Sequence, residues 1–545
     1  MNGRGGGKPS DQARNSQEHL DKHRDTNHQQ KKGLLEAQIG AICFPRKEEN
    51  TIGERWRRAD GLMLGPRYPK FDDLANGTAA SYNPPMDTRT ETDSMGPVEV
   101  DQSRYWGAQT ERARKNFQVS PHRIPVPFLR ALCLLKGEAA AVNATLGLLN
   151  SELAAAIGQA ANEAFSGQFD GEFPLDVFQT GSGTSWNMNA NEVLAGRANE
   201  ILAGARGGKK PVHPNDHVNL GQSSNDVIPS VLNLAGRLEA ERLSGALDDL
   251  CSAFERKATE FSQVVKIGRT HLQDAVPMTL GQEFGGFARQ VQLGAARIRG
   301  VFGRLEELAL GGTALGTGLN THAEFGTRVA SALCGRLGVP FRPARDYFEA
   351  IAARDVQVEL MGALNTVSTS LLKIGNDLRL LSSGPRTGFA EILLPELQPG
   401  SSIMPGKVNP VILEMLNQAC AHVMGKHLSV TIAGQNAPLQ LNIMMPLLAH
   451  ETLSSLDLLT NCVETLRTAC VEGIAADAKR CSAQVERSLA LVTPLAVKLG
   501  YDRAAALAKQ AHAEDKTIRQ LVTEQGLLSE EELNRVLDPR SLAGL

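Results

Sequence analysis

Apolar residues recur at steps of three and four along most of the chain from about Pro127 onward, a spacing typical of amphipathic helices. The strongest helical patterns are rich in alanine and leucine and cover residues 139–165, 227–261, 285–310 and 355–381. Several of these segments exceed 20 residues and carry few polar positions, so they must be buried against one another. The pattern predicts a mainly α protein built around a bundle of long helices, with further helix faces available for contact between subunits.

The pattern changes near both ends of the chain. Residues 1–85 have little apolar periodicity and many Gly, Gln, Asn, His and charged residues, so we expect a disordered extension there. We hypothesise that the native protein starts at Met86, which N-terminal sequencing of natively expressed protein would test. From Cys481 to Leu545 the helical patterns are shorter and are separated by turns such as Leu499-Gly500. We therefore predict domains at 86–220, 221–478 and 479–545, of which the last is a small helical domain.

Composition narrows the class of protein. Of the 545 residues, 42% are hydrophobic and 21% are charged, which is ordinary for a globular protein, and the formal charge of −3 argues against bulk nucleic-acid binding. The eight cysteines form no Cys-x-x-Cys pair, so neither a zinc framework nor a disulfide scaffold is indicated. Such cysteines suit a reducing cytoplasm, so we expect a cytoplasmic protein. No membrane span is expected, because no apolar run approaches the roughly 18–20 residues that a span needs.

The most informative polar segment is the run from Gly400 to Pro410, GSSIMPGKVNP. Its two glycines and two prolines disfavour a regular helix or a central strand, and glycine lets backbone N–H groups approach a ligand closely. Lys407 supplies a positive charge and Asn409 a directional amide, both suited to a carboxylate. A charge-assisted hydrogen bond contributes about 1.5–3 kcal/mol, so a few such donors would hold a small diacid. The alternative is an ordinary surface loop with a solvated lysine.

Four other segments carry small polar side chains, and each has a functional and a structural interpretation. They are QTGSGTSWNMN at 179–189, HPNDHVN with QSSND at 213–226, GRTHLQDA at 268–275, and the Gly/Thr-rich stretch 311–322. The first is either an anion-binding loop or a turn that caps a helix beginning near Met188. In the second, His213, Asp216 and His217 allow a metal site, which we consider the minor alternative to polar recognition.

His271, inside the third segment, and Glu414, which follows the Gly400–Pro410 run, also have two interpretations each. His271 lies among hydrogen-bond donors, and histidine readily exchanges a proton near neutral pH, although a structural histidine is the general alternative. Asn409 and Pro410 are good residues for the start of a helix, and Glu414 would then lie off its apolar face. Glu414 either complements the helix dipole or orients His271.

Taken together, these motifs resemble the fumarase/aspartase superfamily, and within it the class II fumarase family, over roughly 460 residues from about Met86. The resemblance rests on GSSIMPGKVNP, the four segments above, and the stretches DSMG at 93–96 and WGAQT at 106–110. It implies a three-domain fumarase/aspartase-like fold with a central long-helix bundle. It also implies a homotetramer with a 20-helix core, in which three chains share each active site.

The resemblance also assigns roles to individual residues. Ser401 would be the base that removes a substrate proton, and His271, paired with Glu414, would activate or protonate the water. The residues that would bind the substrate are Ser182, Gly183, Thr184, Ser223, Ser224, Asn225, Thr270, Ser402, Lys407, Val408 and Asn409. A secondary carboxylate site would comprise Lys210, His213, Pro214, Asn215 and Asp216. Lys210 stands where the family pattern usually has arginine, so the bidentate fork is lost and weak binding is expected there.

The implied activity is the reversible hydration of fumarate to (S)-malate, without a metal or an organic cofactor. Aspartate ammonia-lyase is the nearest alternative, and the stretch from NPVI at 409–412 through LQLN at 439–442 has some of its character. The segments GSG at 181–183, SSN at 223–225, PGK at 405–407 and NTH at 320–322 favour the fumarase. A catalytically silent structural relative is the remaining alternative. The residues whose joint presence argues against it are Ser401, Lys407, Asn409, His271 and Glu414.

Overall fold

The computed structural model describes residues 87–545, and its secondary structure is mainly helical. The extension predicted for residues 1–85 and the proposed start at Met86 lie outside the described residues. Within residues 87–545, no helix is both long enough and apolar enough to cross a membrane. The prediction of a mainly α protein with a central bundle of long helices is confirmed, whereas the three domain boundaries stay predictions.

The first described elements form a β-hairpin followed by helices. The hairpin turns at Ser94-Met95, and Gly96, the first residue after the turn, adopts a φ of +109° that suits glycine. The elements are β1 (Thr88–Asp93), β2 (Gly96–Asp101), α3 (Ala108–Asn116), α4 (Val126–Thr145), α5 (Ser151–Phe165) and α6 (Thr184–Ala203). The single helical segment expected at 139–165 is wrong, because the chain leaves α4 at Thr145, turns at Gly147 with φ +73°, and starts α5 under an Asn150 cap.

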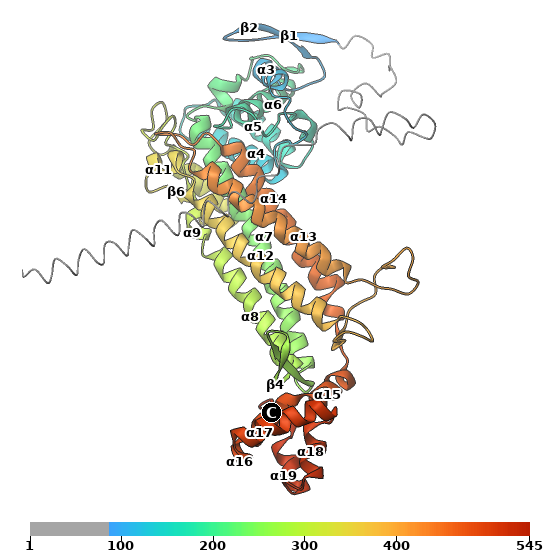
Figure 1. Ribbon diagram of the computed structural model, residues 1–545. Coiled ribbons are helices and arrows are strands. Elements are labelled where there is room, and N and C mark those ends of the chain that lie inside the picture. The colour runs from blue at the N-terminus through green and yellow to red at the C-terminus, as the bar shows by residue number, and fades with distance from the viewer. Residues whose placement is uncertain (1–86) are drawn as a thin grey trace, which may run out of the picture. The chain divides into compact units, whose positions relative to one another are not determined.

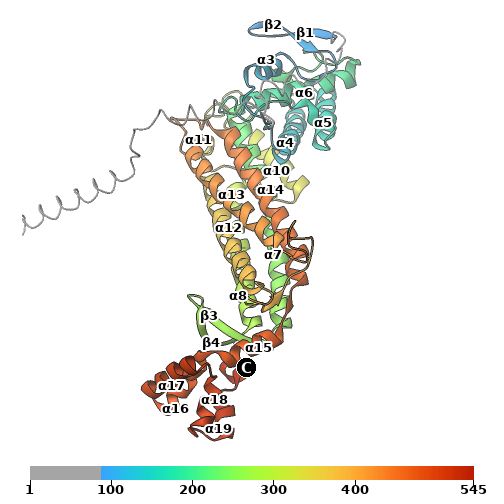
Figure 2. The ribbon, with the colours of Figure 1, turned by 45° about the vertical axis from the view of Figure 1, so that its right-hand side comes forward.

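Five long helices make up the bundle (Figures 1 and 2). They are α7 (Ser224–Glu260), α8 (Leu280–Arg299), α12 (Asp355–Leu381), α13 (Val411–Gly434) and α14 (Met445–Ala469). Helix α7 packs against α8 and α14, α12 packs against α13 and α8, and α13 packs against α14. The predicted helix at 285–310 ends earlier than expected, at Arg299, because Gly300 and Gly303 weaken its continuation.

Short elements connect the long helices. They are β3 (Val265–Thr270), β4 (Gln273–Thr279), α9 (Phe302–Leu305), β5 (Glu307–Leu308), α10 (Phe325–Leu337), β6 (Arg342–Pro343), α11 (Tyr347–Ala352), β7 (Ile392–Leu393) and β8 (Ala475–Ala476). Strands β3 and β4 form an antiparallel hairpin directly after α7. This hairpin was not expected from the sequence, and it carries Thr270 and His271.

The chain ends in a group of short helices with its own apolar core. They are α15 (Ala478–Arg487), α16 (Val492–Leu499), α17 (Tyr501–Glu514), α18 (Ile518–Glu524), α19 (Glu530–Val536) and α20 (Pro539–Leu542). Their buried residues include Leu495, Leu507, Leu521 and Leu533, and Ile267 of β3 joins the same cluster. The β3–β4 hairpin is therefore packed against these C-terminal helices as well as attached to the bundle.

Candidate active site

The segment Gly400–Pro410 forms a loop that closes on itself before α13. The Gly400 N–H donates to the Lys407 carbonyl at 2.7 Å, and the Asn409 side-chain amide donates to the Gly400 carbonyl at 2.7 Å. At its turn, Gly406 adopts φ +81°. The two ends of the loop are thus tied together by bonds that belong to the loop itself.

The Ser401 hydroxyl oxygen accepts two backbone hydrogen bonds inside this loop. The N–H groups of Ile403 and Met404 donate to Ser401 Oγ at 3.2 and 3.0 Å. Two N–H dipoles aimed at one oxygen stabilise negative charge on it, which is what a serine needs in order to act as a base. Ser401 itself is half-buried, whereas Lys407 is exposed to solvent.

The start of α13 differs from the prediction. The helix begins at Val411 with Pro410 at the N-cap position and no side-chain cap, so the expected cap by Asn409 is wrong. The reason is that the Asn409 amide is used to close the loop on Gly400. Glu414 lies in the first turn of α13 and is half-buried. Within the described part of one chain, no hydrogen bond joins Glu414 to His271.

His271 occupies the tip of the β3–β4 hairpin. His271 and Leu272 form its two-residue turn with φ of 56° and 60°, a conformation with both residues in the left-handed region that is matched to the twist of a hairpin. Such values are uncommon for residues other than glycine and concentrate at functional positions. Thr270 and His271 are both exposed, so the hairpin presents them outward.

A buried ionic network holds the base of this hairpin. Arg269 donates to Glu391 at 2.8 Å and to Gln484 at 2.8 Å, and its guanidinium stacks 4.2 Å from the centre of the Phe389 ring. Lys266 lies 2.9 Å from the same Glu391 carboxylate, which is fully buried. These contacts connect the His271 hairpin both to α15 and to the segment that leads into the Gly400–Pro410 loop.

A second group of polar residues lies where α6 and α7 begin, and we call Ser182, Thr184, Ser223, Ser224 and Asn225 the donor cluster. The hydroxyls of Ser182 and Thr184 are 2.7 Å apart, and Ser224 Oγ accepts a bond of 3.0 Å from an α6 side chain. Asn225 donates to the Ala314 carbonyl at 2.8 Å, which brings in the Gly/Thr-rich stretch 311–322. Three segments separated in the sequence therefore meet in one place.

Local geometry in the donor cluster corrects one expectation. Helix α6 begins at Thr184, not near Met188, and its N-cap is Gly183 in the left-handed region with φ +72°. Gly181 has no room for a side chain, because an added Cβ would lie 1.8 Å from the Ile443 carbonyl oxygen. The close approach of these two chain segments is what requires glycine at position 181.

Ser223 and Asp226 build a capping box at the start of α7. Ser223 Oγ accepts from the Asn225 N–H at 3.2 Å, and Asp226 accepts from the Ser223 N–H at 2.9 Å. The other Asp226 oxygen accepts from the N–H groups of Gly311 and Thr313, at 3.1 and 2.9 Å. Burial raises the pKa of Asp226 to about 7, while these backbone donors and the charge of Lys136 act in the opposite direction.

Lys136 is a member of this region that the sequence did not reveal. It sits in α4 within the run LCLLKGEAA, where a lysine looks like an exposed helix position, yet its side chain is completely buried. Its ammonium donates to Asn219 and Gln222 at 2.8 and 2.9 Å. Burial lowers the pKa of Lys136 to about 7, against the opposing charge of Asp226.

The segment predicted as a secondary carboxylate site forms one π-helical turn, Pro214–Val218. His213 Nδ1 accepts from the N–H groups of Asn215 and Asp216 at 3.2 and 3.1 Å, and burial lowers the pKa of His213. The His213 N–H donates to His217 Nδ1 at 2.9 Å. Lys210, His213, Asp216 and His217 line one shallow surface depression. Among residues 87–545, no group of three or more His, Cys, Asp or Glu side chains is arranged to hold a metal ion.

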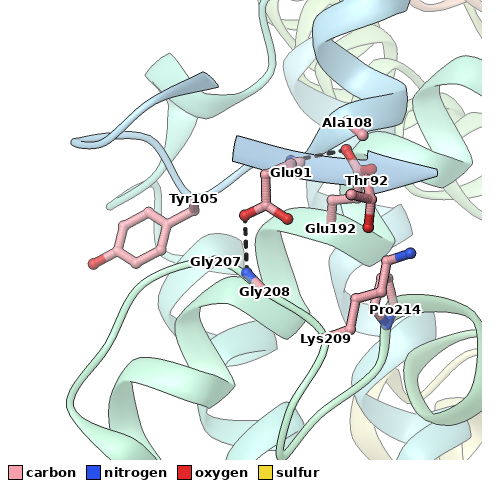
Figure 3. A pocket seen from close by; sticks show the side chains of 10 residues that line it. Glu91, Thr92, Tyr105, Ala108, Glu192, Gly207, Gly208, Lys209 and Pro214 are labelled. Atoms are coloured by element: carbon pink, nitrogen blue, oxygen red, sulfur yellow. Dashed lines mark hydrogen bonds between the residues drawn. The ribbon is translucent and has the colours of Figure 1, made fainter. Parts of the chain in front are cut away.

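A small pocket next to this segment contains two carboxylates, Glu91 and Glu192 (Figure 3). Glu91 accepts from the Gly208 N–H at 2.9 Å. Glu192 accepts from the N–H groups of Gly107, Gln109 and Thr110 at 2.9 to 3.0 Å, at the start of α3. Both carboxylates are therefore occupied by backbone donors, and the pocket is suited to fixing the loop before His213 rather than to binding an anion.

One chain holds the donor cluster far from the His271 hairpin, and the Gly400–Pro410 loop forms a separate group of predicted site residues at the start of α13. The donor cluster lies at the start of α7, whereas the His271 hairpin follows the end of α7 (Figure 1). Because α7 has 37 residues and a helix rises 1.5 Å per residue, these two ends are about 55 Å apart. A single chain therefore does not bring His271 to the donor cluster.

Comparison with known proteins agrees with this fold and with these motifs. Residues 96–425 match the family model described as Lyase, and residues 491–544 match the one described as Fumarase C C-terminus. A class II fumarate hydratase of Methylorubrum extorquens is 50% identical over 461 residues, covering 84% of this chain and 98% of the relative. A second one, of Bradyrhizobium diazoefficiens, is 49% identical over 457 residues, covering 84% of this chain and 96% of the relative.

Solved structures give the same result. A class II fumarase from Schistosoma mansoni superposes with a TM-score of 0.81 at 40% identity, covering 84% of this chain and 99% of that one. The match over residues 96–425 assigns the protein to the lyases. More narrowly, the chain belongs to the class II fumarate hydratase family.

Proposed function

We propose that this protein catalyses the reversible hydration of fumarate to (S)-malate. The observation that carries the proposal is the Gly400–Pro410 loop, in which Ser401 Oγ accepts two backbone N–H groups beside the exposed cation of Lys407. Membership of the class II fumarate hydratase family supports the same activity.

In the dehydration direction, Ser401 removes a proton from C3 of malate. The electron pair of the broken C–H bond moves towards the neighbouring carboxylate and forms an aci-carboxylate, so donors must be aimed where the charge develops. Lys407 supplies a charged donor, and the Asn409 amide keeps one N–H after closing the loop on Gly400. The C2–O bond then breaks as the electron pair returns to form the double bond, and the hydroxyl leaves as water.

His271 and Glu414 are proposed to handle the departing water. His271 would give a proton to the leaving hydroxyl, and Glu414 would orient the imidazole; such general acid catalysis contributes about 10²–10⁴ in rate. His271 is exposed at the tip of the hairpin, so it is accessible to residues of another chain.

The 37-residue length of α7 supports a site that is assembled from several subunits. If chains pack with their bundles antiparallel, the donor cluster of one chain meets the His271 hairpin of another. We propose the homotetramer with a 20-helix core, and active sites shared by three chains, on this basis. Diluting the enzyme until it dissociates should then abolish turnover, as measured by activity and light scattering on the same samples.

The secondary carboxylate site and the cellular location remain finer proposals. The depression lined by Lys210, His213 and Asp216 offers cationic and imidazole groups, but Lys210 provides a point charge without a fork, so weak binding is expected. We propose a cytoplasmic enzyme that needs no metal or organic cofactor. The seven cysteines in the described residues are unpaired, which suits a reducing compartment.

One assay tests the activity and its nearest alternative together. The loss of fumarate absorbance is followed with purified full-length protein, once in buffer alone and once with ammonium added at the same ionic strength. We expect equal rates and malate as the product. A rate that requires ammonium and gives aspartate would establish the ammonia-lyase alternative, and no consumption in either sample would indicate a catalytically silent relative.

A further inference from the structure

Lys136 has an unusual environment for a buried cation. Its side chain has no exposed surface, and its ammonium is bonded to two neutral amide oxygens, Asn219 Oδ1 and Gln222 Oε1. Burying a charge costs free energy, and hydrogen bonds to neutral amides offset this cost less than a contacting carboxylate would. The ionisable groups that act on it are Asp226 of α7 and Cys133 of its own helix.

An ammonium group can only donate hydrogen bonds, so Lys136 fixes the orientation of the amides next to it. Asn219 must present Oδ1 to Lys136, and its Nδ2 then donates to the Gln222 carbonyl at 3.1 Å. Asn187 of α6 meets the same oxygen, so it must present Nδ2, at 3.2 Å. Rotating the Asn187 side-chain amide by 180° would place Asn187 Oδ1 against Asn219 Oδ1.

The second hydrogen of the Asn187 amide reaches the donor cluster. Asn187 Nδ2 donates to Ser224 Oγ at 3.0 Å, so the Ser224 oxygen acts as the acceptor in this bond. The Ser224 O–H is then left to donate in another direction. This arrangement persists although Asn187 Oδ1 is buried without a hydrogen-bond partner among the described residues. Leaving an acceptor unpaired indicates that the orientation is imposed from the Lys136 side.

We propose that Lys136 is a positioning residue that sets the direction of the hydrogen-bond chain Lys136–Asn219–Asn187–Ser224, so that Ser224 offers its O–H to a substrate carboxylate. This inference rests on the proposed function, because it takes the donor cluster as a carboxylate site.

The test is a double-mutant cycle measured as KM and kcat for malate and for fumarate. Lys136→Met keeps the length of the side chain and removes its donors. We expect KM for both substrates to rise about tenfold with a smaller change in kcat, because a contact made equally to substrate and transition state affects mainly KM. In a Ser224→Ala background, the same change should raise KM less than about twofold, because the chain no longer ends in a donor.

Two further variants keep the test decisive. Leu135→Ala removes a fully buried neighbour on α4 and should lower thermal stability while KM stays within about twofold of wild type. If Lys136→Met does not fold, Asn187→Leu breaks the chain at its middle and should give a KM rise that likewise disappears in the Ser224→Ala background.

The outcomes separate this inference from the proposed function. A wild-type enzyme that does not hydrate fumarate contradicts the proposed function. If the wild type is active, two results would overturn the role of Lys136. Either Lys136→Met leaves KM unchanged, or it raises KM by the same factor in the wild type and in the Ser224→Ala background. An equal rise in Leu135→Ala also overturns it, because general loosening of α4 would then explain the effect.

Discussion

The donor cluster at the start of α7 and the Gly400–Pro410 loop hold their polar groups in opposite ways. In the donor cluster, Ser224 and Asn225 bond to other elements, and buried Asp226 and Lys136 lie behind them. In the loop, the hydrogen bonds run between loop residues, and Lys407 faces solvent. One region is integrated into the core of its own chain, whereas the other is a self-contained structure on the surface.

Because of this difference, substitutions in the two regions should have different effects on stability and activity. Polar groups tied into a core contribute to folding, so substitutions there should affect stability as well as binding. Exposed groups that bond only within a short loop contribute little to the fold, so substitutions there should affect activity alone. The following experiments begin with the largest expected effect. All of them test this division between the two regions except Glu200→Gln, which tests an ion-paired carboxylate near the end of α6.

Ser401→Ala should lower kcat by about 10²–10⁴ because it removes the proposed base. The midpoint of urea unfolding should stay at the wild-type value, since the Ser401 hydroxyl contacts only N–H groups of its own loop. Ser382→Ala, at the end of α12, is the matched control and should keep full turnover. Wild-type turnover in Ser401→Ala would refute the assigned role.

Lys407→Met should lower kcat/KM for malate by about 10- to 100-fold, which corresponds to the loss of one charge-assisted hydrogen bond of about 1.5–3 kcal/mol in the transition state. The effect should weaken as ionic strength rises, because Lys407 is exposed and its field is screened. Lys479→Met removes an exposed lysine from α15 and serves as the control. Equal kcat/KM values for the two variants would show that Lys407 does not contact the reacting substrate.

Glu200→Gln should lower the free energy of unfolding at pH 7 by up to about 3 kcal/mol. Burial opposes ionisation of Glu200, but hydrogen bonds from Tyr105, Arg206 and Arg197 bring its pKa down to about 2. A depressed carboxyl pKa stabilises the fold above the unfolded value near 4.5, and this contribution is lost as the pH falls towards 2.

Urea titrations of wild type and Glu200→Gln at pH 7, 4 and 2.5 measure this effect. The difference in unfolding free energy should shrink at each step down in pH. Glu464→Gln on α14 should show no such trend, since its side chain makes no ion pair among residues 87–545. A difference that stays constant with pH would mean that Glu200 acts by packing.

Ser223→Ala should cost about 1 kcal/mol of stability, because it removes the cap of α7. This change in stability is the smallest expected effect, yet it tests the comparison of the donor cluster with the loop directly. The corresponding substitution in the loop, Ser401→Ala, should not change the stability. Chemical denaturation of Ser223→Ala beside Ser401→Ala gives the result. Equal stability of the two variants would show that the donor cluster is no more integrated than the loop.

The helical part of the fold could be predicted well from the sequence, because long apolar periodicity admits few other structures. Residues 355–381 were expected as a helix and form α12 over the same range. The His271 hairpin was missed because its turn is His271-Leu272, which lacks the Asn-Gly or Asp-Gly pair that marks such turns. The strand β4 also contains Pro277, which disfavours a strand.

The candidate site could be predicted in its residue types but not in its arrangement. Motif residues such as Ser182 and Ser224 stand out because hydroxyl and amide side chains are clustered beside glycines in those segments. Lys136 does not stand out, because its burial depends on α4 packing against α7 and on the turn that holds Asn219. The separation of the donor cluster from His271 is equally invisible in the sequence, since it depends on α7 being one uninterrupted helix.

That uninterrupted helix also limits how the length of the chain can change. Adding or removing one residue within α7 would turn everything beyond it by about 100° and shift it by 1.5 Å. Both the packing of α7 on α8 and the orientation of the His271 hairpin would be lost. Insertions and deletions should therefore be selected against within residues 224–260.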